Sequence, residues 1–140
     1  MDTAFLQENW MLVALAVLSG VMLLWSFVGS KLSGVEEADT LKATRLYNDE
    51  ALILDVRETS EFESGHIPKA RHIPLGQLGK RLDEIQGHKD KTVLVNCRSG
   101  ARSARACRML KKAGFASVYN LAGGFLAWER ANLPVTKKKK

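Results

Sequence analysis

Cys97 is the residue whose type and position point most directly to chemistry. It follows an apolar run at residues 93–95 that predicts a buried strand, and a helix rich in Ala, Arg and Leu is expected to begin near Ala101. In an open parallel sheet, a cysteine between a strand and a helix lies at the carboxyl edge, where ligands and reactions collect. The helix N-terminus, Arg98 and Arg102 all favour negative charge there. The sequence therefore predicts a Cys97 thiolate near neutral pH.

Alternating strands and helices are expected to position this cysteine. Apolar or extended runs at residues 51–56, 70–74 and 117–120 predict three further strands. The expected helices are one starting at Asp39 or Thr40, a brief one capped by Thr59 or Ser60, one within residues 75–85, one from Ala101 to Gly114, and one after Gly123-Gly124. This alternation predicts an α/β fold, a parallel sheet with helices on both faces.

The composition fits one globular domain with a basic surface. The chain has 140 residues, a net charge of +6, and hydrophobic and charged fractions of 46% and 26%, which are those of a folded protein. Two cysteines ten residues apart make no disulfide framework, so a reducing compartment is expected. The basic charge suits anionic small substrates or an anionic membrane surface. No basic stripe with interleaved aromatics is present, so we expect no nucleic-acid partner.

An uncharged stretch near the N-terminus has the length of a membrane span. Residues 11–29 hold only apolar, small or hydroxylated side chains, and as a helix they would reach roughly 28 Å, about the hydrocarbon thickness of a bilayer. Trp10 and Trp25 lie toward its ends, as interfacial aromatics do. A cleaved signal peptide is the competing interpretation, but it needs a basic n-region and a small-residue cleavage site, which this stretch lacks. We therefore expect a retained single transmembrane helix.

The charges that flank the span predict its orientation. Lys31, Lys42 and Arg45 follow the span and no basic residue precedes it, so the positive-inside rule places the N-terminus outside and the globular part in the cytoplasm. The expected organisation is an N-terminal segment at 1–30, a linker at 31–38, a globular domain at 39–135 and a solvated basic tail at 136–140.

Two groups of motifs make the globular part resemble a rhodanese domain. The first half holds Asp55-Val-Arg57-Glu58, Phe62, Gly65-His66-Ile67-Pro68 and Ile73-Pro74. The second half holds Cys97-Arg98-Ser99-Gly100-Ala101-Arg102-Ser103, Ala113-Gly114-Phe115, Leu121-Ala122-Gly123-Gly124, Trp128 and Leu133-Pro134. The resemblance covers residues 39–135 in the family's order. With its N-terminal span, the layout is similar to small membrane-anchored bacterial rhodaneses, which implies a location at the inner membrane.

The resemblance implies a sulfurtransferase of the thiosulfate:cyanide type with no cofactor. Cys97 would attack a small anionic donor such as thiosulfate, become a persulfide, and pass the sulfur to a thiol or protein acceptor. The residues support this chemistry independently, because backbone N–H groups of residues 98–103 can surround an anionic sulfur as a nest. The expected substrate-binding residues are Arg98, Ser99, Gly100, Ala101, Arg102 and Ser103. Gly100 lets the loop turn, and Arg98 and Arg102 are expected to hold an anionic donor.

Two other functions compete with sulfur transfer. Cysteine phosphatases use a related loop, but with five residues between Cys and Arg. Here four residues separate Cys97 from Arg102, and the tighter loop suits sulfur rather than phosphate. An interaction module that keeps the fold and transfers sulfur only incidentally is the remaining alternative, and the intact cysteine and loop disfavour it.

Four residues near the motifs also have structural interpretations. Asp55 and Arg57 are supporting candidates because they follow a strand, but an ion pair that braces the loop is the favoured interpretation. His66 is expected to brace a turn, and Cys107 to pack in the core of a helix rather than act as a resolving thiol. The three histidines do not cluster with Cys97 at metal-ligand spacing, so no metal is predicted.

Overall fold

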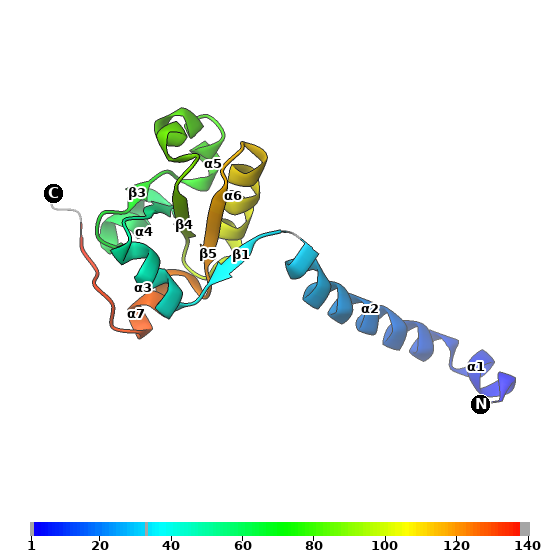
Figure 1. The fold of residues 1–140 in the computed structure, drawn as a ribbon. Coiled ribbons are helices and arrows are strands. Elements are labelled where there is room, and N and C mark those ends of the chain that lie inside the picture. Colours follow the sequence, from blue (N-terminus) through cyan, green and yellow to red (C-terminus); the bar gives the residue numbers. More distant parts are fainter. Residues whose placement is uncertain (1, 33, 138–140) are drawn as a thin grey trace. The chain divides into compact units, whose positions relative to one another are not determined.

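The structure, a computed structural model, describes residues 2–32 and 34–137 and divides into two compact units. The first unit ends at Gly34 and holds α1 (Thr3–Glu8) and α2 (Trp10–Leu32). Within α2, Trp10–Val28 is long and apolar enough to cross a bilayer (Figure 1). A membrane anchor and a signal sequence both have this character, so the structure supports one apolar N-terminal helix of either kind.

The second unit, which begins at Val35, is built on a five-stranded sheet. The strands lie in the order β1-β5-β4-β2-β3, and neighbouring strands run parallel. Their bounds are β1 (Glu36–Ala38), β2 (Leu52–Asp55), β3 (Arg71–His72), β4 (Thr92–Asn96) and β5 (Ser117–Leu121). Because all strands share one direction, the carboxyl ends of β2, β4 and β5 meet at one edge, and Cys97 directly follows the central strand.

Helices cover both faces of this sheet, which confirms the predicted fold class (Figure 1). They are α3 (Thr40–Asn48), α4 (Thr59–Ser64), α5 (Leu75–Leu78), the 3₁₀ helix η1 (Leu82–His88), α6 (Ala101–Lys112) and α7 (Gly124–Arg130). Side chains alternate along β4, so Val93 and Val95 join a core with α5, η1 and α6, whereas Leu94 joins a core with α3 and α7. Both faces are buried, which explains why the strand reads as a continuous apolar run.

Four local expectations were wrong. The expected linker contains β1, which pairs with β5 at the sheet edge. Glu58, not Thr59 or Ser60, caps α4, because it forms a reciprocal capping box with Glu61. The single helix expected within residues 75–85 is split into α5 and η1. Thr136, placed in the solvated tail, exchanges two backbone hydrogen bonds with His66, both 2.9 Å long.

Candidate functional site

The Cys97 sulfur lies at the bottom of a loop that turns hydrogen-bond donors toward it. Only 1% of the residue is exposed. The backbone N–H of Gly100 donates to Sγ at 3.1 Å, and the Ser103 hydroxyl lies 3.3 Å from Sγ. Gly100 has a φ of 111°, a left-handed conformation that side chains disfavour, so the role predicted for this glycine in the turn is confirmed. The loop is a concave nest built to stabilise an anionic sulfur.

These donors decide the acidity of Cys97. Burial of the sulfur raises the pKa, but the hydrogen bonds from the Ser103 hydroxyl and from the backbone N–H groups of Ser103, Gly100 and Ser99 outweigh burial. The net effect is a pKa below the usual value for a thiol. Hydrogen bonds to the charged form therefore make this buried cysteine easier to ionise, as the sequence predicted.

Arg102 is engaged by a partner that the sequence did not reveal. Its guanidinium makes a two-pronged ion pair with Glu61 of α4, with N–O distances of 2.8 and 2.9 Å. The bond to Arg102 is the main cause that lowers the pKa of Glu61 to about 2. Arg102 was expected to grip a donor directly. Here it bridges two helices, and its pKa is raised chiefly by the hydrogen bond to Glu61 and to a smaller extent by the charge of the Cys97 sulfur.

Asp55 and Arg57 form the buried brace that their position suggested. Arg57 donates from Nε and Nη2 to the Asp55 carboxylate at 2.9–3.1 Å, and from Nη2 to the Gly65 carbonyl at 2.7 Å. Its guanidinium also lies 4.3 Å from the centroid of the Phe125 ring. With 4% and 0% of the two side chains exposed, the pair ties the end of β2 to the turn before β3.

The first residues of α7 hold the cysteine loop in place through backbone hydrogen bonds. The N–H groups of Phe125 and Leu126 donate to the carbonyls of Cys97 and Arg98 at 2.7 and 3.2 Å. A Cβ on Gly124 would lie 2.5 Å from the Arg98 carbonyl carbon and oxygen. The sequence predicted a turn at this glycine pair, but the close approach of two backbones that requires Gly124 is visible only in the fold.

Asn120, at the end of β5, is a second site residue that the sequence did not single out. Its Oδ1 accepts from the Ser103 hydroxyl at 2.5 Å, and its Nδ2 donates to Glu37 Oε1 and to the Gly100 carbonyl, both at 3.1 Å. Both Asn120 and Ser103 are buried. Its position could have identified it, because Asn120 is a polar residue near the carboxyl end of β5, and β5 is adjacent to β4, which Cys97 follows.

Three other polar residues have structural roles. His66 contacts the Phe62 carbonyl through Nδ1 at 2.7 Å and stacks on the Phe62 ring at 3.7 Å between centroids. His72 stacks on the same Phe62 ring, with 4.4 Å between the centroids, and its Nε2 contacts the Arg57 carbonyl at 2.7 Å. Cys107 is fully buried, and burial is the main cause that raises its pKa to about 12. The packing interpretation of Cys107 is confirmed.

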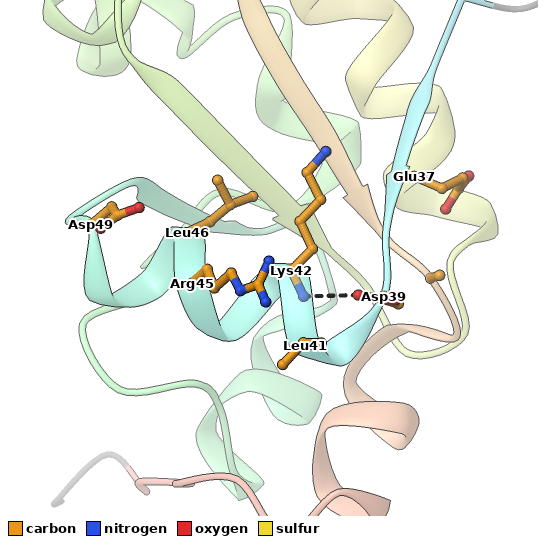
Figure 2. Close-up of a pocket in the computed structure, with 8 residues that line it drawn as sticks. Glu37, Asp39, Leu41, Lys42, Arg45, Leu46 and Asp49 are labelled. Atoms are coloured by element: carbon orange, nitrogen blue, oxygen red, sulfur yellow. Dashed lines mark hydrogen bonds between the residues drawn. The ribbon is translucent and has the colours of Figure 1, made fainter.

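A hollow of about 350 Å³ opens beside the cysteine loop. Its walls include Arg98 and Glu61, an apolar strip of Phe125, Leu126 and Val135, and Lys137. A separate hollow of about 700 Å³ runs along α3, where acidic and basic side chains such as Asp39 and Lys42 alternate (Figure 2). None of the predicted site residues lines the α3 hollow, so the hollow beside Arg98 is the candidate entrance to the site.

A family model and several known proteins match this chain. The model of the rhodanese-like domain matches residues 37–131. The chain belongs to the rhodanese-like family. A sulfurtransferase of Allochromatium vinosum is 37% identical over 99 residues, which are 71% of this chain and 91% of the relative. Its name, together with the family, supports sulfur transfer in general as the activity of this rhodanese-like chain.

Two further comparisons bear on how far the likeness extends. The uncharacterized protein YqhL of Bacillus subtilis is 50% identical over 78 residues, which are 56% of this chain but only 60% of that relative. The crystal structure of a rhodanese-related protein of Thermoplasma volcanium has a TM-score of 0.67 and 27% identity. The match covers 74% of this chain and 99% of the Thermoplasma volcanium chain. The rhodanese-like domain is thus the shared part.

Proposed function

We propose that this chain is a membrane-anchored sulfurtransferase that carries sulfane sulfur on Cys97, with thiosulfate as a donor. The observation that supports the proposal most directly is the set of hydrogen-bond donors around a sulfur that is otherwise buried. At Cys107, the packing cysteine, burial outweighs the groups that lower the pKa and raises it to about 12, whereas at Cys97 the donors outweigh burial. The chemistry that benefits from these donors has an anionic sulfur in the loop both before and after the reaction. The anion is first the Cys97 thiolate and then the outer sulfur of its persulfide.

The reaction has two steps. The Cys97 thiolate attacks the outer sulfur of thiosulfate, the sulfur–sulfur bond of the donor breaks, and sulfite leaves with the electron pair of that bond. This step leaves a Cys97 persulfide, which the N–H groups of the loop stabilise. A nucleophilic acceptor, such as cyanide or a thiolate, then attacks the outer sulfur, and the Cys97 thiolate leaves. A ping-pong mechanism follows.

The charges beside the entrance suit an anionic donor. Arg98 is exposed and lines the hollow next to Cys97, and the Arg102 charge lies near the sulfur although Glu61 partly neutralises it. We assign donor binding chiefly to Arg98 and to the loop N–H groups, and the positioning of the loop to Arg102. The apolar strip of Phe125, Leu126 and Val135 lies where the organic part of a thiol acceptor would pack.

The intact mass of the full chain in detergent, measured after incubation with thiosulfate, tests the chemistry. The wild type should gain one sulfur atom, and cyanide should remove it. Cys97→Ser should gain none, whereas Cys107→Ser, the matched control, should gain sulfur like the wild type. No gain with thiosulfate or with an organic persulfide would instead favour the interaction module, in which the fold is kept and sulfur transfer is incidental.

We also propose that α2 is a retained anchor of the bacterial inner membrane, with the N-terminus outside and the rhodanese-like domain in the cytoplasm. The basic residues Lys31, Lys42 and Arg45 follow the apolar stretch at residues 11–29, and no basic residue precedes it. The chain should stay in the membrane pellet after an alkaline carbonate wash and keep its N-terminal residues. A soluble product that lacks α2 would show a signal sequence instead.

A further inference from the structure

A line of hydrogen bonds leads from the edge strand β1 to the reactive sulfur. Glu37 accepts from Asn120, Asn120 accepts from Ser103, and the Ser103 hydroxyl lies 3.3 Å from Cys97 Sγ. Two strands, β1 and β5, contribute to this line together with α6 and the loop after β4, and β1 pairs Glu37 with Asn120 in the sheet. Ser103 and Asn120 are 0% and 3% exposed, so water has little access to them.

The orientation of the Asn120 amide is fixed by its donors. The NH₂ group has two oxygen acceptors, one from Glu37 and one from the Gly100 carbonyl, each at 3.1 Å. The reverse orientation would bring Oδ1 against these two oxygens, which carry no proton to share. The Asn120 oxygen must therefore face Ser103 and can only accept a hydrogen bond from it.

The Ser103 hydroxyl has a single proton and two acceptors for it. Asn120 Oδ1 lies at 2.5 Å, and Cys97 Sγ lies at 3.3 Å. The 2.5 Å contact to Asn120 Oδ1 is at the short end for a hydroxyl donor. Because one proton serves both acceptors, the share that Asn120 takes weakens the hydrogen bond that Ser103 donates to the thiolate.

We propose that Asn120 is a positioning residue that competes with Cys97 for the Ser103 proton and so limits how strongly Ser103 stabilises the thiolate. Glu37 keeps the competing oxygen in place. The inference rests on Cys97 being the reacting group of the proposed function. Its consequence is a balance between the two steps, because a more acidic thiol leaves the persulfide faster but attacks a donor less readily.

The test is alkylation of Cys97 by iodoacetamide in the full chain in detergent, followed against pH, with the labelled residue identified by peptide mass. Asn120→Leu removes the competing oxygen, so Ser103 becomes free to donate to sulfur. The pKa of Cys97 should fall, and at a fixed pH below it the thiolate fraction should rise by about threefold to tenfold, as expected when an existing hydrogen bond to the thiolate becomes stronger. Asn120→Ala should act in the same direction without added bulk.

Two controls separate competition from a general change in the site. Asn96→Leu makes the same exchange one residue before Cys97, at a side chain that contacts Asp55, and should leave the pKa of Cys97 unchanged. In a Ser103→Ala background, Asn120→Leu should have no further effect. An unchanged or raised pKa in both Asn120 variants, or an equal fall without Ser103, would overturn the proposal.

Alkylation uses no sulfur donor, so its outcome is separate from that of the sulfur-transfer test. If Cys97 gains no sulfur but the Asn120 variants lower its pKa, the proposed function fails and the role of Asn120 stands. If Cys97 gains sulfur but the pKa does not fall, the function stands and Asn120 is a purely structural residue.

Discussion

At the scale of single residues, the reactive sulfur depends on backbone geometry more than on nearby cationic side chains. The groups that lower the pKa of Cys97 are Ser103 and the N–H groups of its own loop. Arg102 adds a positive charge near the sulfur, but its guanidinium is already bound to the Glu61 carboxylate. A change in the path of the loop should therefore alter Cys97 more than the loss of one positive charge would.

The pH dependence of Cys97 alkylation follows from these groups. The thiolate is the reactive form, so the alkylation rate should rise as pH increases through the lowered pKa of Cys97. The rate should reach its plateau at a lower pH than the rate for a free cysteine does. Ser103→Ala should move this rise to higher pH, because it removes a donor to the thiolate. Cys107, whose pKa is raised to about 12, should stay unlabelled throughout and serves as the internal control. A rise at the pH of free cysteine would contradict this account.

Gly124 offers a second prediction at this scale. It has a φ of 61°, and an added Cβ would lie 2.5 Å from the Arg98 carbonyl. We expect Gly124→Ala to lower the free energy of unfolding by about 2 kcal/mol, because it combines backbone strain with a clash that cannot relax cheaply. Urea unfolding measures this change. Gly76→Ala, at a glycine whose Cβ would meet nothing within 4 Å, is the matched control and should be near neutral.

At the scale of elements, the Glu61–Arg102 pair fastens α4 to α6. Glu61 has a pKa of about 2 in the folded chain against 4.5 for an ordinary glutamate. Its folded pKa is the lower one, so the pair stabilises the fold above pH 4.5 and loses that contribution as pH falls toward 2. Because the two side chains are 26% and 34% exposed, solvent screening reduces the contribution to roughly 1 kcal/mol.

Glu61→Gln should therefore be less stable than the wild type by about that amount at neutral pH, and the difference should shrink as pH falls toward 2. Thermal unfolding at several pH values measures this convergence. Glu63→Gln, on the same helix and exposed, removes the same charge without touching Arg102. An equal loss of stability in both variants would mean that the pair itself contributes nothing.

The sequence predicted the elements that carry apolar periodicity and missed those that depend on tertiary partners. β2 and β4 are largely buried, mostly apolar runs, and α6 begins at the predicted Ala101. In contrast, β1 is Glu-Glu-Ala, whose pairing with β5 comes from the sheet and not from its own residues. The same reasoning applies to the site. Cys97 and its loop form a local motif, whereas Glu61, Asn120 and Glu37 reach it from distant parts of the chain.

At the scale of the whole molecule, the chain divides at Gly34, so the second unit includes β1. We expect the fragment Val35–Lys140 to fold and to keep the Cys97 pKa of the full chain. A fragment that starts at Asp39, where the domain was expected to begin, lacks β1 and Glu37. It would leave β5 as a bare sheet edge, and such edges promote association between chains.

Size-exclusion chromatography and Cys97 alkylation compare the two fragments directly. The longer fragment should elute as a single species and react like the full chain in detergent. The shorter one should elute partly as aggregates, with an altered alkylation profile because Asn120 has lost one acceptor. Identical behaviour of the two would show that β1 is dispensable for both the sheet and the site.

The placement of β1 and of the Thr136 bridge has a consequence for protein engineering. The chain enters the sheet along β1, at one edge, and its last described residues lie against His66, near β3 at the other edge. Four strand spacings separate these edges, or roughly 19 Å. A circular permutant that joins the two ends would need about six extended residues to cross that width.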